Sequence, residues 1–175
     1  MVDIIVMKNK VIEIDFLYLD LNTCDRCMET EHTLDVAVEE LSKPLKSLGY
    51  NLIVNKVNIT NASLAETHKF MSSPTIRVSG RDILGEILEN TCGACSDISG
   101  TSTSCRVFVY DGKTYNDPPK AMIMDGILKV LYGSDDKFGI LPSMEAPYVI
   151  PENLTTFFEG CTSENTRCCG EEVKV

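Results

Sequence analysis

The chain has 175 residues, of which 43% are hydrophobic and 24% charged, and its formal net charge is -10. This size and composition predict one globular domain, or one domain with an appendage, and exclude a fibrous or disordered chain. The basic residues are scattered through the sequence, so the acidic excess argues against a nucleic-acid partner. No segment approaches the roughly 20 apolar residues of a membrane span, which argues against a membrane partner.

The eight cysteines are the most informative part of the composition. The first seven residues are too short for a secretory signal and include Asp3, which favours a cytoplasmic location. In such a reducing compartment, Cys-x-x-Cys pairs indicate redox chemistry or metal binding rather than structural disulfides. The chain has two such pairs and four further cysteines, namely Cys24/Cys27 and Cys92/Cys95, then Cys105, Cys161, Cys168 and Cys169.

In chain order, the hydrophobic pattern first predicts a strand, a long helix and a second strand. Residues 12–19 alternate and then become apolar, as a strand entering a core does. In the helix that follows, apolar residues recur at three- and four-residue spacings as far as Leu48. Pro44 should kink or divide this helix, and Gly49 should end it. The second strand is expected at 52–59.

The middle of the chain predicts smaller elements around one long loop. Asn61 should cap a short helix, and Pro74 opens the next strand. Residues 83–104 are rich in small polar side chains and are interpreted as a cysteine-containing surface loop. Regular structure should resume at Cys105, with Asp111-Gly112 as a hairpin turn before a final core helix.

These elements predict an α/β fold with a mixed sheet, in which the first two strands are parallel and the later ones antiparallel. The predicted domain covers 1–133, including the loop at 83–104. An extension follows at 134–175, with one short helix that Gly160 ends and a cysteine-rich tail. Two phenylalanines, Phe157 and Phe158, should dock that helix on the core.

Two places in the sequence resemble the thioredoxin superfamily. One is the strand, Cys-x-x-Cys, helix arrangement at Cys24–Cys27, and the other is Ser73-Pro74 at the start of a later strand. The chain is also similar to a small prokaryotic family of uncharacterised thioredoxin-like proteins, through Thr30-Glu31 after the first pair and Ser-Pro-Thr-Ile-Arg at 73–77. The resemblance implies a three-layer sandwich and a cis Ser73-Pro74 peptide bond that faces the dithiol.

The resemblance also implies thiol–disulfide chemistry at the first pair. At a helix N-terminus the backbone N–H groups stabilise a thiolate, so Cys24 is the expected nucleophile. Cys27, one turn further on, would resolve the mixed disulfide, and the backbone beside Pro74 would bind a substrate segment. Thr23 stands where working reductases have tryptophan, and Asp25-Arg26 replaces Gly-Pro. Metal ligation by the pair and an inert pair are the alternatives.

The remaining cysteines leave several interpretations open. Cys92, Cys95 and Cys105 bracket one loop, and they can form a disulfide, bind a soft ion with three thiolates, or stay free. The loop is also long enough to return to the first pair, which would place four thiolates around one zinc ion at Cys24, Cys27, Cys92 and Cys95. The tail cysteines Cys161, Cys168 and Cys169 can relay electrons, transfer a soft ion, or be idle.

The sequence therefore supports three functional hypotheses. The first is a thiol–disulfide oxidoreductase with Cys24, Cys27 and Pro74 at its site and a disulfide-containing protein or a small thiol as partner. The second is a thiolate-rich carrier that binds zinc, copper or arsenic without catalysis. The third is an interaction domain that merely retains the cysteines.

Overall fold

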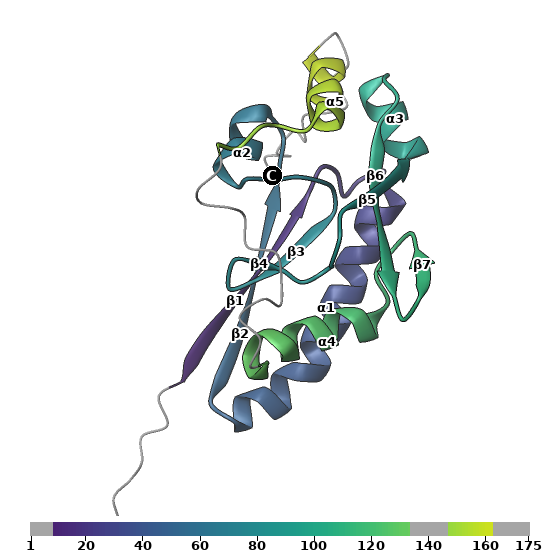
Figure 1. The fold of residues 1–175 in the computed structure, drawn as a ribbon. Helices are drawn as coiled ribbons and strands as arrows, with labels where there is room; N and C mark the ends of the chain where they lie inside the picture. Colours follow the sequence, from purple (N-terminus) through teal and green to yellow (C-terminus); the bar gives the residue numbers. More distant parts are fainter. Residues whose placement is uncertain (1–8, 134–146, 163–175) are drawn as a thin grey trace, which may run out of the picture.

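A mixed four-stranded sheet carries the main core of the protein (Figure 1). The computed structural model describes residues 9–133 and 147–162. Their elements are, in order, β1 (Lys10–Tyr18), α1 (Asp25–Ser47), β2 (Tyr50–Asn58), α2 (Ala62–Thr67), β3 (Thr75–Val78), β4 (Arg81–Asp82), β5 (Leu88–Thr91), α3 (Gly93–Ser99), β6 (Ser104–Tyr110), β7 (Lys113–Tyr115), α4 (Lys120–Tyr132) and α5 (Glu152–Thr162).

The strand directions confirm the predicted mixed sheet. The strand order is β2-β1-β3-β4, with β1 parallel to β2 and antiparallel to β3. A separate antiparallel sheet has the order β5-β6-β7, and its β6–β7 turn lies at Asp111-Gly112, as expected. Both turn residues have positive φ, which is the conformation that a two-residue hairpin of this type requires.

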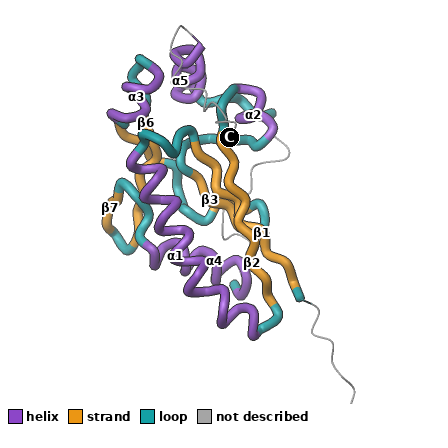
Figure 2. Tube along the Cα trace, turned by 180° about the vertical axis from the view of Figure 1, so that it is seen from behind, coloured by secondary structure: helices purple, strands orange, loops and turns teal. Residues whose placement is uncertain are grey.

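Helices α1 and α4 pack against one face of the four-stranded sheet (Figures 1 and 2). The buried face of α1 carries Leu34, Ala37, Leu41 and Leu45, at the three- and four-residue spacings of one helical stripe. These side chains share a hydrophobic cluster with inward-facing residues of β1 and β3 and with Ile123 of α4. This cluster holds β1 and α1 in place. The loop between them leads to Cys24, a residue of the candidate site.

Of the two effects expected of Pro44, a kink or a division of the long helix, the division does not occur. Helix α1 continues through Pro44 to Ser47 and ends before Gly49, whose φ is +84°. Pro44 lies on the exposed side of the helix, and so does Glu40, whose carbonyl loses its usual donor. Because solvent can satisfy that carbonyl, the helix tolerates the proline.

The expectation of a long surface loop at 83–104 is also wrong, because the segment contains β5 and α3. Strand β5 has no partner nearby in the sequence; it pairs with β6, from Leu88 opposite Val107 to Thr91 opposite Ser104. All four residues of β5 are exposed, so they show no apolar alternation. In α3, serine hydroxyls bond to carbonyls one turn back, which makes a serine-rich sequence compatible with a helix.

The short C-terminal helix is confirmed, but it does not end at Gly160, since α5 reaches Thr162. At Gly160, α5 comes so close to α3 that a Cβ atom would overlap the carbonyl oxygen of Ser99. Phe157 and Phe158 are buried, as expected. The tail cysteines Cys168 and Cys169 lie outside the described residues. Among the described helices, none is long and apolar enough to cross a membrane.

A buried ion pair fixes β6 against the rest of the core. The fully buried Arg106 donates from Nη1 to Asp82 Oδ2 at 2.6 Å and to Thr75 Oγ1 at 3.2 Å.

Asp82→Ala would leave a buried guanidinium charge unpaired, so we expect it to lower the free energy of unfolding by about 3–5 kcal/mol. Urea unfolding measures this. The double change Asp82→Leu with Arg106→Met should recover most of the loss, whereas equal losses in both variants would contradict the prediction.

Candidate metal centre

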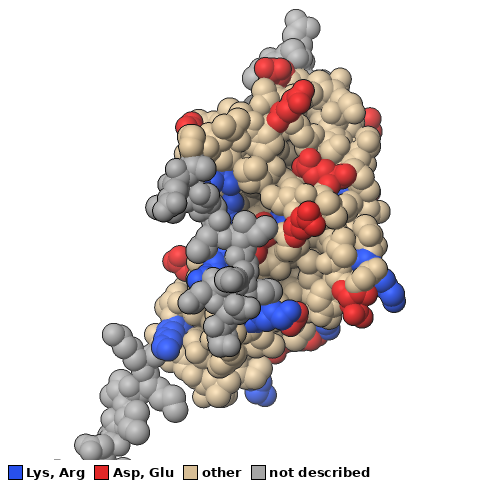
Figure 3. All heavy atoms as spheres, viewed as in Figure 1, with Lys and Arg blue, Asp and Glu red and all other residues tan. Residues whose placement is uncertain are grey.

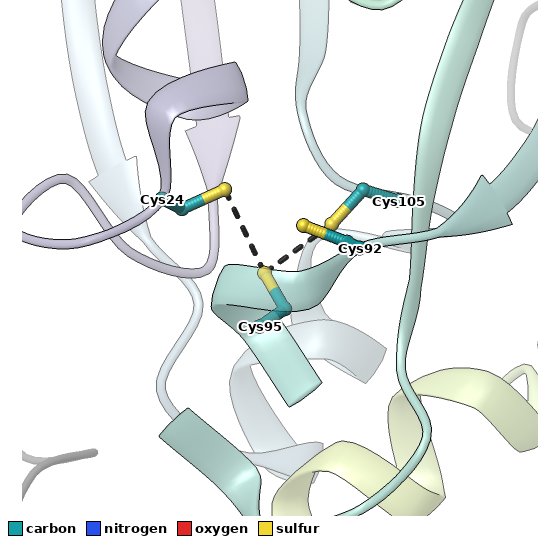
Figure 4. Close-up of side chains that lie close together, drawn as sticks. All are labelled: Cys24, Cys92, Cys95 and Cys105. Atoms are coloured by element: carbon teal, nitrogen blue, oxygen red, sulfur yellow. Dashed lines mark hydrogen bonds between the residues drawn. The ribbon is translucent and has the colours of Figure 1, made fainter. Parts of the chain in front are cut away.

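Four cysteine side chains from three segments of the chain meet at one point. The sulfur atoms of Cys24, Cys92, Cys95 and Cys105 all lie within 4.8 Å of one another, and all four residues are buried. Figure 4 shows the four side chains converging from α1, α3 and β6. None of them forms a disulfide, so the centre contains four free thiols.

Local structure explains how each sulfur reaches this point. Cys24 is the N-cap residue of α1, and Cys92 is the N-cap residue of α3. Cys95 lies in the first turn of α3, three residues after Cys92, so both sulfurs project from the same end of that helix. Cys105 lies in β6, next to the turn that returns from α3. The pairing of β5 with β6 therefore brings the second Cys-x-x-Cys pair beside Cys105.

The sulfur separations suit one tetrahedral ion. Cys95 Sγ lies 3.7 Å from Cys24 Sγ, and Cys105 Sγ lies 3.2 Å from Cys95 Sγ. Four thiolates at the usual zinc–sulfur distance of about 2.3 Å define a tetrahedron with edges of about 3.8 Å. The sulfurs are thus near ligand positions, and the site requires only small side-chain shifts to accept an ion.

The thiols of the centre also polarise one another. Hydrogen bonds from four neighbouring thiols, Cys105 foremost, lower the pKa of Cys24 well below that of an ordinary thiol. A hydrogen bond with Cys105 is the largest cause that lowers the pKa of Cys92 to about 7. The pKa of Cys95 is raised chiefly by its contact with Cys105, and that of Cys105 chiefly by its contact with Cys24. A cation at this point would replace the protons that these sulfurs share.

Cys27 is not a member of the group of four. Its sulfur is fully buried and contacts the Ser73 hydroxyl at 3.4 Å. The contact with Cys24 is the largest cause that raises the pKa of Cys27 well above the ordinary value, and burial adds to it. Cys27 therefore stays a thiol beside the centre.

Charged side chains position two of the four grouped cysteines. The Asp20 carboxylate accepts backbone N–H bonds from Asn22, Thr23 and Cys24 at 2.6–3.0 Å, which fixes the turn before α1. The Arg26 guanidinium donates to the carbonyl oxygens of Cys105 at 2.9 Å and Arg106 at 3.1 Å. These hydrogen bonds of Arg26 tie α1 to β6.

Helix α5 and a network of hydroxyl groups hold the other side of the centre. The amide group of Asn153 accepts from Ser104 N at 2.8 Å and donates to Ser104 O at 2.7 Å, directly beside Cys105. The Ser99 hydroxyl contacts those of Thr101 and Thr103 at 2.8 and 3.0 Å. These bonds keep α3 in register with β6.

The substrate surface expected beside Pro74 is covered in the structure. The Ser73-Pro74 peptide bond is cis, as the resemblance implies. Pro74 is buried, however, and the carbonyl of Ser73 accepts the backbone N–H of Arg106 at 2.7 Å. An extended segment that paired with this backbone would have to displace the start of β6.

The structure thus groups the predicted cysteines in a new way. The four-thiolate hypothesis grouped Cys27 with Cys24, Cys92 and Cys95, whereas the structure groups Cys105 with those three. The loop cysteines do converge as one alternative proposed, and Cys24 completes their set. The roles of the Asp20 carboxylate and the Ser73 hydroxyl were not predicted, because an aspartate in a polar turn and a serine before proline are common in loops.

Comparisons with known proteins identify a family without giving an activity. No curated protein and no solved structure matches the chain, so the thioredoxin-like sandwich stays a prediction. Residues 12–127, more than half of the chain, match a family of unknown function. The matched range includes all four cysteines of the centre. The chain belongs to the family described as Domain of unknown function (DUF2703).

Proposed function

We propose that this protein binds one thiophilic metal ion through the thiolates of Cys24, Cys92, Cys95 and Cys105. The observation that carries the proposal is the convergence of four buried sulfurs, from three separate segments, within 4.8 Å. A free cysteine in a core packs as a small hydrophobic side chain and needs no other sulfur beside it. Four that meet at one point instead provide a complete set of soft ligands.

Zinc suits this centre best among the candidate ions. Zn(II) prefers four thiolates in a tetrahedron, and a site closed by four protein ligands is typical of structural zinc rather than catalytic zinc. Copper(I) and trivalent arsenic also favour thiolates, but three sulfurs already satisfy trivalent arsenic, and the centre offers four. We therefore assign the site a structural or carrier role, in which the ion joins α3 and β6 to the start of α1.

The electrostatic surroundings support a bound cation. Four thiolates and one divalent ion leave two net negative charges in a buried place. The N-terminus of α1, a helix of 23 residues, directs partial positive charge toward Cys24 and offsets part of that excess. The reducing, cytoplasmic compartment that the sequence predicts would keep the thiols available for the ion.

Metal analysis combined with thiol titration tests the proposal. We expect protein purified without oxygen to contain about one equivalent of zinc, and a strong chelator to make four additional thiols reactive. Adding zinc back should protect the same four, which alkylation and peptide mapping identify as Cys24, Cys92, Cys95 and Cys105. A metal-free protein that takes up no zinc, with the same thiols reactive before and after chelation, would contradict the proposal.

A second candidate function is dithiol chemistry at Cys24 and Cys27, supported by the position of this Cys-x-x-Cys pair at the start of α1. In that case the Cys24 thiolate attacks a disulfide of a partner protein or small thiol, and Cys27 displaces the partner as a thiolate. Both sulfurs are fully buried, which disfavours this function relative to metal binding. Reversible formation of the Cys24–Cys27 disulfide in metal-free protein, read by peptide mapping after mild oxidation, would support it.

A further inference from the structure

A cleft of about 300 Å³ opens beside the four-sulfur centre. Its walls come from the first turn of α1, the junction of β5 with α3, and the residues after β7. Its lining includes Asp25, Arg26, Glu29, Cys92, Gly93 and Asp117. Of the four cysteines in the centre, one therefore lines a cleft that opens to solvent.

Cys92 is also the cysteine of the centre that solvent reaches. The residue is 6% exposed, whereas Cys24, Cys95 and Cys105 are 0% exposed. The exposed Gly93 follows it, so no side chain covers Cys92 from that position. An ion that approaches from solvent through the cleft therefore meets Cys92 before the other three cysteines.

The rim of the cleft is acidic. Asp25, Glu29 and Asp117 are exposed, and within the described part of the chain none of them forms an ion pair. The one cation in the lining, Arg26, already donates to two backbone carbonyls of β6. On the face shown in Figure 3, carboxylates dominate the half of the molecule that holds α3 and α5. The net charge of the whole chain is also negative, at -10. Such a rim raises the local concentration of cations.

We propose that this cleft is the route by which a hydrated divalent cation reaches the centre, with Cys92 as the first ligand. The inference rests on the proposed metal-binding function and adds how the ion enters. A metal–water bond breaks as the bond to Cys92 Sγ forms, and the thiol proton leaves to bulk water. The same exchange follows at Cys95, Cys24 and Cys105, while the metal stays divalent throughout. The acidic rim makes a free cation the preferred form over an anionic thiol complex.

Stopped-flow uptake of Cd²⁺ by metal-free protein, followed by the sulfur-to-cadmium absorbance, tests the route. The cleft variant is Asp25→Asn, Glu29→Gln, Asp117→Asn. The matched control is Glu13→Gln, Glu39→Gln, Glu66→Gln, which removes the same charge from exposed positions that do not line the cleft. At low salt the cleft variant should bind about tenfold more slowly, and the control should stay within about twofold of the wild type. High salt should remove most of the difference.

Three outcomes separate the route from the proposed function. Equal rates in the two variants, with one ion bound to each, would overturn the route and leave the metal site standing. A wild-type protein that takes up no ion would overturn the metal site itself, and the route with it. In metal-free protein, limiting iodoacetamide should alkylate Cys92 before Cys24, Cys95 or Cys105, and earlier modification of any of those three would contradict the proposed order.

Discussion

Cys95→Ser is expected to abolish stoichiometric metal binding, with the affinity for zinc falling at least about 100-fold. Cys95 Sγ contacts the sulfurs of both Cys24 and Cys105, so it lies between the ligands of α1 and β6. A serine hydroxyl is a poor ligand for a soft ion, and even changes behind the ligands cost 10–100-fold in affinity. Competition with a zinc chelator of known affinity measures the loss, and metal analysis of purified protein gives the stoichiometry.

Cys27→Ser is the matched control for that variant. It makes the same chemical change at another fully buried cysteine, and serine can keep a hydrogen bond to Ser73. Because Cys27 is not one of the four grouped sulfurs, this variant should still bind one zinc ion with an affinity within about tenfold of the wild type. If Cys27→Ser loses zinc as completely as Cys95→Ser does, the assignment of the four ligands is wrong.

Removing the metal is expected to loosen β5 and α3 while the main core stays folded. Helix α3 has seven residues, and two of the proposed ligands, Cys92 and Cys95, lie at its start. The core that joins α1, α4 and the four-stranded sheet contains none of the grouped cysteines. Hydrogen exchange across residues 88–105 should therefore quicken at least about tenfold on chelation, and exchange in the middle of α1 should hardly change.

The thermal stability of the protein should also depend on the bound metal. A ligand at a thousandfold excess over its dissociation constant stabilises the folded state by about 4 kcal/mol, so chelation should lower the thermal midpoint. Protons act in the same direction as a chelator, because the ligands bind metal as thiolates and acid returns their protons. Falling pH should therefore release zinc and loosen β5 and α3. A midpoint that chelation leaves unchanged in the wild type would contradict this account.

The sequence was most informative where a residue's partners lie nearby in the chain. The stripe of α1, the Asn61 cap, whose side chain accepts from Leu64 N at 2.9 Å, and the turn at Asp111-Gly112 all follow from local spacing and backbone preference. The mixed sheet follows from the order of strands and helices. These elements place Cys24 at the start of a helix, and the structure confirms that position.

Predictions from the sequence were wrong where a strand pairs outside its own segment and its side chains are polar. Strand β5 is fully exposed, and its partner β6 follows only after helix α3, so the polar residues of β5 resemble a loop. That error made the second Cys-x-x-Cys pair part of a surface loop, whereas Cys92 and Cys95 are buried. The exchange of Cys27 for Cys105 among the four could not be predicted, because it depends on side-chain directions at a helix N-terminus and on the position of β6.

X-ray absorption spectroscopy of the zinc-loaded protein identifies the atoms that bind the ion. We expect a first shell of four sulfur atoms at about 2.3 Å and no nitrogen or oxygen ligand. The spectrum of Cys27→Ser should be identical, and Cys95→Ser should show no such shell at one equivalent of zinc. A shell that contains nitrogen or oxygen, or one that loses a sulfur in Cys27→Ser, would contradict the assignment of Cys24, Cys92, Cys95 and Cys105 as the metal ligands.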